Sequence, residues 1–433
     1  MSASPVACGR CDEVYPDLAG IPWLLPRPQL SLSEWRGRAR AALARLRQQS
    51  QQYAARLLPA VSRASTRRRI QLLARACDDH ARQLGELLQP LLGDPVTSNP
   101  ATYQGLAPAQ TASLNPLAYY ANVHRDWCWG GQENAASLEM VRAAFDARTP
   151  GRTLVLGAGA GRLAYDVHEL LGPGLTVAAD INPLLLLVAQ RMFAGESLEL
   201  HEFPLAPRDL ESFAVRRTLA APRAARPGLR VVFADARQPP FAPASFDSVV
   251  TPWLVDVIDA DLEALAAVVN RLLRPGGVWI CTGTLFFERV DPAQAYSGTE
   301  VGEVVRAAGF EQPAFHERRV PYLVSPASRH ARHEDVVTFA VTKLAKAGPV
   351  RSPGDPWFED PRRPVPLSAA LEHRTLALRI EGYVASLVDG RRSVADIVER
   401  LVQERLLLPD EAVGIVRDYL QRQLAAAEQG GVS

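Results

Sequence analysis

The spacing of apolar residues predicts helices in the first part of the chain. From Ser33 to about Leu92, apolar side chains return at steps of three and four residues, the repeat that lines one face of an α-helix. Ser33 is a residue type that caps helix N-termini, so we expect the first helix to begin there. Residues 67–69 are three arginines that open the second helix, and we interpret them as part of its solvated face.

The pattern changes between Thr153 and Lys343, where short β-rich runs alternate with helical ones. The runs are TLVLGA, LTVAAD, LRVVFAD, FDSVVTP, GVWICTG and VVTFAVTKL. Strands that alternate with helices specify a parallel sheet with helices on both faces. The predicted fold is therefore α/β, a Rossmann-like doubly wound sheet.

A different composition follows the last of these runs. The stretch AGPVRSPGDPWFEDPRRPVP is rich in proline and predicts a linker over residues 346–366. A small unit then covers residues 367–433, with an apolar helix that ends at residues 389–390, a capped helix from Ser393 and a third helix from Asp410. Its stretch LVDGRRSVADIVERL resembles the small PqqD-like winged-helix domain, a peptide-binding module, which implies a precursor peptide as partner. A plain helical appendage is the alternative.

Composition and charge exclude several classes of protein. The chain has 433 residues, 47% of them hydrophobic, a net charge of +1, and arginines scattered along its length. It therefore has no positive field suited to nucleic acid, and no apolar run approaches the roughly eighteen residues of a membrane span. The N-terminus lacks an export signal, and five cysteines are too few for a disulfide framework. We expect a cytoplasmic protein that binds neither nucleic acid nor membranes.

Three glycines follow the first strand-like run. Gly157, Gly159 and Gly161 form G-x-G-x-G, whereas a dinucleotide site needs G-x-G-x-x-G, with the helix N-terminus facing a pyrophosphate. S-adenosylmethionine has no phosphate and needs only a backbone that approaches it closely, which glycine permits. The spacing therefore favours S-adenosylmethionine over a nicotinamide cofactor.

Acidic residues end the next two strand-like runs. Asp180 ends the second run, where a carboxylate can accept hydrogen bonds from both ribose hydroxyls of a nucleoside. Asp235 ends the third run and is placed to meet the adenine amino group. Together with the glycines and the helix–turn–strand stretch LLRPGGVWICTG, these residues make the chain resemble class I S-adenosylmethionine-dependent methyltransferases. The resemblance implies a seven-stranded sheet, over residues 146–345.

A narrower resemblance lies upstream of the glycines. The stretch HRDWCWGGQENAASLEMVRAAF, with an Arg-Asp-Trp segment before a helix, is similar to carnosine N-methyltransferase and its relatives. The order of a helical N-terminal region, this segment and the glycine strand agrees with that family, as does a long insertion at about residues 201–229. The resemblance covers about residues 30–343 and implies that residues 30–145 form a helical region and cofactor lid.

This resemblance assigns roles around the cofactor. Asn122 and Arg125 would close over its methionine end, where a guanidinium suits a carboxylate. The alternative for Arg125 is a surface ion pair with Asp126. Trp127 and Trp129 either pack over the adenosyl group or are buried structural residues. The expected cofactor-binding residues are Asn122, Arg125, Gly157, Gly159, Gly161, Asp180, Asn182, Asp235, Ala236 and Trp253.

The fourth strand-like run leads into the segment expected to hold the methyl acceptor, TPWLVDVIDA. In the family an aspartate here holds the imidazole of the acceptor, and the matching residue is Asp256. A carboxylate bonded to one ring N–H fixes the tautomer, aims the other nitrogen and stabilises the positive charge that develops. The alternative is that Asp256 caps the next helix. The expected catalytic residues are Asp256, Glu288 and Tyr322, and Phe287 joins them in binding the substrate.

Other features depart from the family or imitate a metal site. Glu288 stands where the family has a histidine, so we expect an altered imidazole pocket. Cys8 and Cys11 resemble half of a short zinc ribbon over residues 1–29, but no second pair of ligands follows at ribbon distance. A further cluster lies in a stretch rich in Ser, Pro and Arg, interpreted as a loop with solvated side chains: His330, His333 and Glu334. We expect no bound metal.

The sequence thus predicts an N-methyltransferase for a small imidazole- or amine-bearing acceptor, such as a histidine derivative or a histidine-containing peptide. Three alternatives stay open. The C-terminal unit would make it a peptide-modifying enzyme if it binds a precursor peptide. The chain would otherwise be a cofactor-binding scaffold without catalysis, or a nicotinamide-dependent dehydrogenase.

Overall fold

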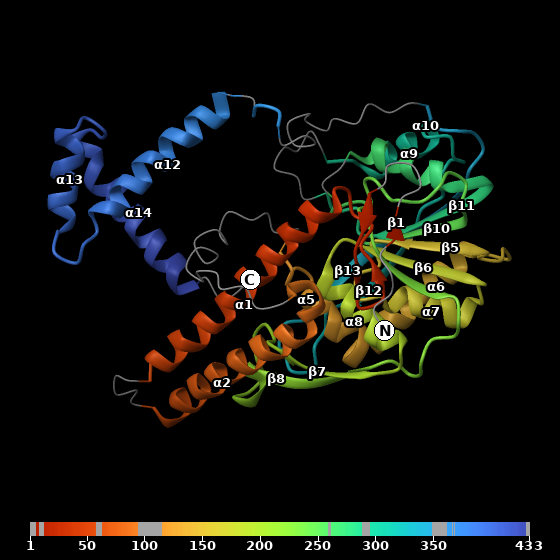
Figure 1. The fold of residues 1–433 in the computed structure, drawn as a ribbon, viewed down its shortest axis with the longest axis horizontal. Coiled ribbons are helices and arrows are strands. Elements are labelled where there is room, and N and C mark those ends of the chain that lie inside the picture. Colours follow the sequence, from red (N-terminus) through yellow and green to blue (C-terminus); the bar gives the residue numbers. More distant parts are fainter. Residues whose placement is uncertain are drawn as a thin grey trace. The chain divides into compact units, whose positions relative to one another are not determined.

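The structure is a computed structural model, and it describes residues 6–7, 13–57, 63–93, 115–258, 261–287, 295–348, 362–365, 367 and 369–429. The chain divides into two compact units, Met1–Arg351 and Ser352–Ser433 (Figure 1). The division falls inside the stretch that the sequence predicts as a linker. None of the helices in the described ranges combines the length and the apolar character that a membrane span needs.

A seven-stranded sheet forms the centre of the first unit. Its order is β12-β13-β11-β10-β5-β6-β9, and β13 alone runs antiparallel to its neighbours. The other six strands point the same way, so their carboxyl ends meet at one edge of the sheet. The strands are β5 (Arg152–Leu156), β6 (Leu175–Asp180), β9 (Leu229–Phe233), β10 (Phe246–Pro252), β11 (Leu273–Gly283), β12 (His316–Tyr322) and β13 (Arg332–Thr342).

Helices cover both faces of this sheet, which confirms the predicted doubly wound α/β fold. Helices α6, α7 and α8 pack on one face, and α9 and α10 pack on the other (Figure 1). On β5, Val155 lies in the first of these cores, and Leu154 and Leu156 lie in the second. Burial on both faces explains the continuous apolar runs of the sequence. The helices are α6 (Gly131–Phe145), α7 (Arg162–Leu171), α8 (Pro183–Phe193), α9 (Leu262–Leu272) and α10 (Gly298–Ala307).

Long helices precede the sheet, as the apolar spacing predicts. The expected start at Ser33 is wrong, because α1 begins earlier, at a proline, whose fixed φ and missing N–H suit the first turn of a helix. At the start of α2, the exposed Arg68 pairs with Glu211, and the guanidinium of Arg69 lies 5.2 Å from the centre of the Phe213 ring. The helices are α1 (Pro28–Ala55), α2 (Ala64–Leu87), α3 (Gln89–Leu92) and α5 (Tyr120–His124), followed by the π-helix η3 (Arg125–Trp129).

Apart from the short strands of the N-terminal segment, three described strands of this unit are absent from the sequence prediction. β7 (Ser197–Glu202) and β8 (Val215–Ala220) form an antiparallel hairpin in the insertion after α8, with the short 3₁₀ helix η4 (Glu211–Phe213) between them. The third is the edge strand β12, whose sequence HERRVPY has no apolar alternation. Charged residues and a proline are typical of edge strands, because they discourage pairing with further chains.

The N-terminal segment packs against the β9 edge of the sheet. Trp23 is fully buried, with its ring centre 4.9 Å from that of Phe233, and the backbone N–H of Leu24 donates to the Phe233 carbonyl at 3.0 Å. Cys8 and Cys11 lie outside the described residues. The short strands of this segment are β1 (Val6–Ala7), β2 (Val14–Tyr15), β3 (Asp17–Leu18) and β4 (Ile21–Pro22).

In its described residues the second unit contains three helices and no strand. Its middle helix begins after Ser393, whose side chain makes the predicted capping box with Asp396. A separate small core holds the helices together: Val384, Leu387, Ile397, Leu401, Val416 and Tyr419. The helices are α12 (Ala369–Leu387), α13 (Val394–Gln403) and α14 (Pro409–Gln429). The helical part of the prediction is confirmed, and no strand of a winged helix is present in the described residues.

Candidate active site

The glycine-rich turn joins β5 to α7, and its three glycines serve different purposes. All three have positive φ, at 76°, 57° and 86° for Gly157, Gly159 and Gly161, a region that other residues rarely adopt. A Cβ on Gly157 would lie 2.9 Å from Leu254, and one on Gly161 would lie 2.7 Å from Phe193. A Cβ on Gly159 would meet nothing within 4 Å. The outer glycines therefore permit close packing, and the middle one faces open space beside the turn.

Asp180 lies at the end of β6, beside this turn. Its Oδ2 accepts the backbone N–H of Gly159 at 2.8 Å, and its Oδ1 accepts that of Asn182 at 2.9 Å. Burial raises the pKa of this carboxyl, while the backbone hydrogen bonds lower it. A carboxylate has about four acceptor positions, so lone pairs remain for further donors. The open space at Gly159 and these lone pairs fit a nucleoside with two ribose hydroxyls.

Two other residues predicted at the cofactor are engaged within the protein. The Asn182 side chain caps α8 by accepting the Leu184 N–H at 3.0 Å, and it donates to the Pro116 carbonyl at 3.2 Å. The Asp235 carboxylate forms an ion pair with Arg237 at 2.7 Å. The half-buried Ala236 follows Asp235 at the end of β9. Roles of these residues toward the cofactor stay predictions.

The Arg-Asp-Trp segment forms the π-helix η3, which packs beneath the glycine turn. Trp127 is buried, and its Nε1 donates to the Ala160 carbonyl of the turn at 2.8 Å. Its ring meets Tyr165 and Phe193 edge to face. Of the two interpretations of Trp127, the structure therefore supports the buried structural residue. The Nε1 of Trp129 is also buried and has no hydrogen-bond partner in the described part of the chain.

Arg125 lies in a buried group of charges. Its Nε donates to Asp126 at 2.7 Å and its Nη1 to Glu133 at 2.9 Å. Burial lowers the pKa of Arg125, but the two carboxylates outweigh this effect and raise it. The ion pair with Asp126, the alternative interpretation of Arg125, is therefore present. It is buried, whereas the sequence interpretation places it on the surface. Asn122, half-buried on α5, lies one turn before Arg125.

The carboxyl ends of β10 and β12 bring two other predicted residues to one edge of the sheet. Trp253 follows β10 and Tyr322 ends β12, and their ring centres lie 4.8 Å apart. The guanidinium of Arg332, the register partner of Tyr322 on β13, lies 4.4 Å from the centre of the Tyr322 ring. Burial raises the pKa of Tyr322. The aromatic pair therefore forms one wall at this edge, with a cation behind it.

The same edge carries a feature that the sequence did not indicate. Trp253, Leu285 and Leu323 have φ of 50°, 51° and 51°, in the left-handed region that bulky residues rarely adopt. Each follows the carboxyl end of one of the strands β10, β11 and β12, which point the same way in the sheet. Backbone strain of this kind clusters at functional sites, where the surrounding structure holds it in place. No glycine marks these positions, so composition gives no hint of them.

Asp256 lies at this edge and is only 4% exposed. Its Oδ2 accepts the Thr284 hydroxyl at 2.8 Å and the Phe286 backbone N–H at 3.0 Å. Its Oδ1 is buried and has no hydrogen-bond partner among the described residues. The alternative role as a helix cap is wrong, because Asp261 caps α9 by accepting the Glu263 N–H at 2.8 Å. Asp256 therefore combines a fixed position with an unpaired acceptor atom.

Of the two remaining predicted acceptor residues, the structure describes Phe287. Phe287 is 7% exposed and packs in the core that underlies α9 and α10, against Tyr296 at 5.4 Å between ring centres. The exposed aromatic side chain in this turn is that of Phe286. A substrate role for Phe287 stays a prediction, and Glu288 lies outside the described residues.

The histidine stretch after β12 is only partly a loop: His330 precedes the next strand and is exposed, as predicted. His333 and Glu334 belong to strand β13, where His333 pairs with Pro321 across the ladder and Glu334 pairs with Arg332 at 2.9 Å. The charged residues at the start of β13 give no apolar alternation, so the sequence pattern does not indicate a strand there.

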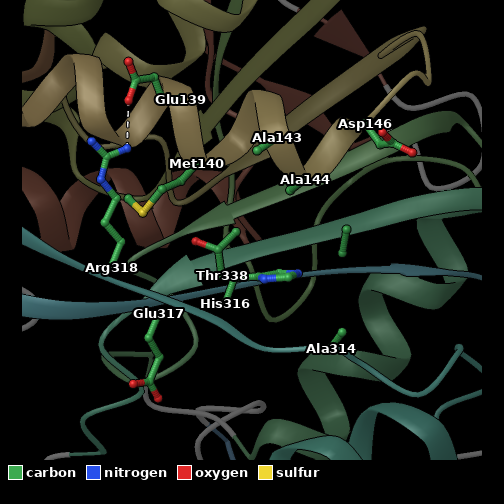
Figure 2. A pocket seen from close by; sticks show the side chains of 11 residues that line it. Glu139, Met140, Ala143, Ala144, Asp146, Ala314, His316, Glu317, Arg318 and Thr338 are labelled. Atoms are coloured by element: carbon green, nitrogen blue, oxygen red, sulfur yellow. Dashed lines mark hydrogen bonds and ion pairs between the residues drawn. The ribbon is translucent and has the colours of Figure 1, made fainter.

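A cavity of about 570 Å³ lies elsewhere, between α6 and strands β12 and β13. Figure 2 shows Met140 on α6 and His316 and Thr338 on the strands beside it, with the ion pair between Glu139 and Arg318 at its rim. His316 begins β12, whereas Tyr322 ends it. The cavity is therefore at the opposite end of this strand from the edge that carries Tyr322 and Asp256.

Comparisons with known proteins identify the sheet domain. Residues 154–281, less than half of the chain, match the family model of a methyltransferase domain. No curated protein matches the chain. The match spans the glycine turn, Asp180 at the end of β6, and Asp235 and Asp256, which follow β9 and β10.

Solved structures with low similarity include three methyltransferases. One, from Thermotoga maritima, is described as a possible histamine N-methyltransferase (18% identity, 53% of this chain and 95% of that one, TM-score 0.32). The others are phosphoethanolamine N-methyltransferase 2 from Haemonchus contortus with S-adenosyl-L-methionine (16%, 50% and 53%, TM-score 0.33) and an S-adenosylmethionine-dependent methyltransferase from Methanosarcina mazei (16%, 47% and 97%, TM-score 0.32). At these values the likenesses identify no acceptor. The family model confirms the predicted enzyme class: residues 154–281 form a methyltransferase domain, and the enzyme uses S-adenosylmethionine.

Proposed function

We propose that this enzyme methylates a nitrogen of a small acceptor that carries an imidazole or an amine, and that Asp256 holds the acceptor. The observation that carries the proposal is the unpaired, buried Oδ1 of Asp256 at the carboxyl ends of the strands. Ligands of open α/β sheets bind at these ends. An orphaned carboxylate oxygen is costly inside a protein, so a functional reason for it is expected.

The chemistry of the site suits a nitrogen nucleophile. Bound S-adenosylmethionine supplies an electrophilic methyl group. Imidazole, with a pKa of about 6.5, offers a neutral lone pair at neutral pH, so no strong base is needed. The Asp256 carboxylate would accept the N–H of the ring, orient its other nitrogen and stabilise the positive charge that forms. Trp253 and Tyr322 lie at the same edge, where the tyrosine ring already contacts the guanidinium of Arg332.

The residues around the glycine turn would hold the cofactor. Asp180 keeps lone pairs for the ribose hydroxyls, and the open space at Gly159 allows close approach of the nucleoside. Arg125 already binds two carboxylates, so a third on the cofactor would share its charge with Asp126 and Glu133. We therefore expect Asp180 to contribute more to cofactor affinity than Arg125.

A methyl-transfer assay tests the proposal. Labelled S-adenosylmethionine is offered to the enzyme with carnosine, histamine, histidine and simple primary amines. We expect transfer to at least one imidazole or amine, and its loss in Asp256→Asn. An amide oxygen at this position can still accept the bonds from Thr284 and Phe286, while the amide NH₂ replaces the unpaired acceptor. No transfer to any of these acceptors, or full activity of Asp256→Asn, contradicts the proposal.

A second candidate is the modification of a peptide bound by the C-terminal unit. The observation that favours it is the set of exposed apolar side chains on a unit that has its own core: Leu408 at 61%, Val413 at 43% and Ile415 at 42% exposure. A chain that ends at Arg351 should then methylate free carnosine normally but lose activity on histidine-containing peptides. Equal activity of both chains on every peptide excludes this candidate.

A further inference from the structure

The turn after β11 makes two hydrogen bonds to a single oxygen of Asp256. Thr284 donates its hydroxyl and Phe286 its backbone N–H, and both reach Oδ2. We propose that Thr284 is a positioning residue, which locks Oδ2 into the protein and reserves Oδ1 for the methyl acceptor. This inference rests on the proposed function of Asp256 and assigns a different role to each of its two oxygens.

The two hydrogen bonds to Oδ2 are needed because the carboxylate by itself has little preference for one orientation. The last torsion of an aspartate side chain is broad and roughly two-fold, so the two oxygens exchange places easily when nothing holds them. Two donors on Oδ2 remove this freedom. Methyl transfer depends on alignment of the acceptor nitrogen, and a misplacement of about 1 Å can cost about 100-fold in rate. A fixed Oδ1 therefore gives the acceptor a fixed point of attachment.

The backbone of the turn aims both donors at the same atom. Leu285 lies between Thr284 and Phe286, and its left-handed φ of 51° belongs to the turn that carries both donors. The branched Cβ of threonine restricts its χ1, which limits the directions available to the hydroxyl. Strain in a non-glycine residue persists only where the surroundings hold it. Here the two hydrogen bonds to Asp256 stabilise the conformation of the turn, and the same bonds fix the orientation of the Asp256 carboxylate.

Gly283 keeps room beside the other oxygen. It is buried at the end of β11, and an added Cβ would lie 3.9 Å from Oδ1 of Asp256 and 3.4 Å from Cα of Trp253. These are ordinary contact distances, so Gly283→Ala can fold while placing a methyl group against Oδ1. It therefore probes the space between Trp253 and Oδ1, whereas Thr284→Val probes the hydrogen bond to Oδ2.

The experiment compares Thr284→Val, Thr284→Ser and Gly283→Ala with the unaltered chain, using carnosine and histamine. Thr284→Val keeps the shape and removes the donor. We expect it to lower kcat/KM for the acceptor at least 10-fold and to leave the affinity for S-adenosylhomocysteine within twofold. Thr284→Ser restores the donor and should recover most of the activity. Gly283→Ala should raise the KM of the acceptor, also without an effect on S-adenosylhomocysteine binding.

Thr338→Val is the matched control. This buried threonine donates its hydroxyl to Thr282 at 3.1 Å in the neighbouring strands, so its loss removes a comparable hydrogen bond away from Asp256. Its kinetic constants should stay within twofold of the unaltered chain. The positioning role is overturned by full activity of Thr284→Val, by a Thr284→Ser variant as impaired as Thr284→Val, or by equal losses in Thr338→Val.

Asp256→Asn separates a failure of this inference from a failure of the proposed function. Full activity of that variant removes the proposed function. Loss of activity in Asp256→Asn with none in Thr284→Val removes only the positioning role. A readout without turnover is the affinity for imidazole of the S-adenosylhomocysteine complex, followed by tryptophan fluorescence. Thr284→Val should weaken it at least fivefold and Thr284→Ser should restore it; equal affinities contradict the inference, and no binding by the unaltered enzyme contradicts both proposals.

Discussion

Mild acid should destabilise this enzyme through three buried histidines, His80 on α2, His124 on α5 and His201 on β7. We call them the histidine cluster. His80 and His124 flank Tyr120, with ring centres 5.0 and 5.1 Å from it, and His201 lies 6.5 Å from His80. The Nδ1 atoms of His80 and His124 are buried without a hydrogen-bond partner among the described residues. A proton there would have no acceptor.

The pKa values of the cluster reflect this burial. Burial lowers the pKa of His80 to about 3, helped by repulsion from the other two imidazoles and opposed by Asp79. Burial also lowers the pKa of His124 to about 4, opposed by Glu202 and helped by Arg217. For His201 burial again lowers the pKa. The imidazoles of His80 and His124 are therefore neutral in the folded enzyme at pH 5, whereas in the unfolded chain they are protonated at this pH.

The size of the effect follows from this difference. A group with a lowered pKa in the folded state contributes full stability above its unfolded pKa of about 6.5, and this contribution is lost as the pH falls toward the folded value. At about 1.4 kcal/mol per pH unit, one such histidine costs about 2 kcal/mol at pH 5. His80 and His124 together cost about 4 kcal/mol, a large part of the 5–15 kcal/mol that typically stabilises a domain.

Urea unfolding at pH 7 and at pH 5 measures this loss. The double variant His80→Gln with His124→Gln cannot take up these protons, so its free energy of unfolding should fall about 4 kcal/mol less than that of the unaltered chain. His316→Gln, at an exposed position on β12, is the matched control and should leave the difference unchanged. An equal fall in the double variant and the unaltered chain would refute the assignment to the histidine cluster.

Three further predictions concern the active site. Asp256→Asn should lower kcat about 100-fold or more while the melting temperature stays within a few degrees, measured by methyl transfer and by calorimetry; a matching loss of stability would instead indicate a structural role. In Gly161→Ala the added methyl group meets neighbouring side chains, so the free energy of unfolding should fall by about 3 kcal/mol. In Gly159→Ala the methyl group has space, so the free energy of unfolding should fall by about 1 kcal/mol, while S-adenosylhomocysteine binding measured by calorimetry should weaken. Equal losses of stability in the two variants would contradict this distinction. Glu133→Gln breaks a buried ion pair and should lower the free energy of unfolding in urea by about 3 kcal/mol. Glu139→Gln breaks an exposed ion pair and should lower it by less than about 1 kcal/mol. Similar losses in the two variants would show that burial does not determine the contribution of these ion pairs to stability.

The central sheet could be predicted because its strands are buried on both faces. Leu154, Val155 and Leu156 alternate between two cores, so the strand appears in the sequence as one apolar run. The edge strand β12 and the hairpin of β7 and β8 are half exposed, and their charges interrupt any apolar pattern. The start of α1 was misplaced at Ser33 because a serine inside a helix resembles a cap, and only the chain geometry shows that the helix begins before it.

The candidate site could be predicted only as far as local sequence determines it. Glycine spacing identified the turn at residues 157–161, because positive φ selects glycine there. At the edge of the sheet that carries Asp256, the residues with left-handed φ are Trp253, Leu285 and Leu323. Tertiary contacts hold them in this conformation, and their sequence has no local signature of it. The bond from Thr284 to Asp256 joins residues 28 positions apart. Because that contact decides which oxygen of the carboxylate is unpaired, resemblance can suggest the aspartate, but only the folded chain distinguishes its two oxygens.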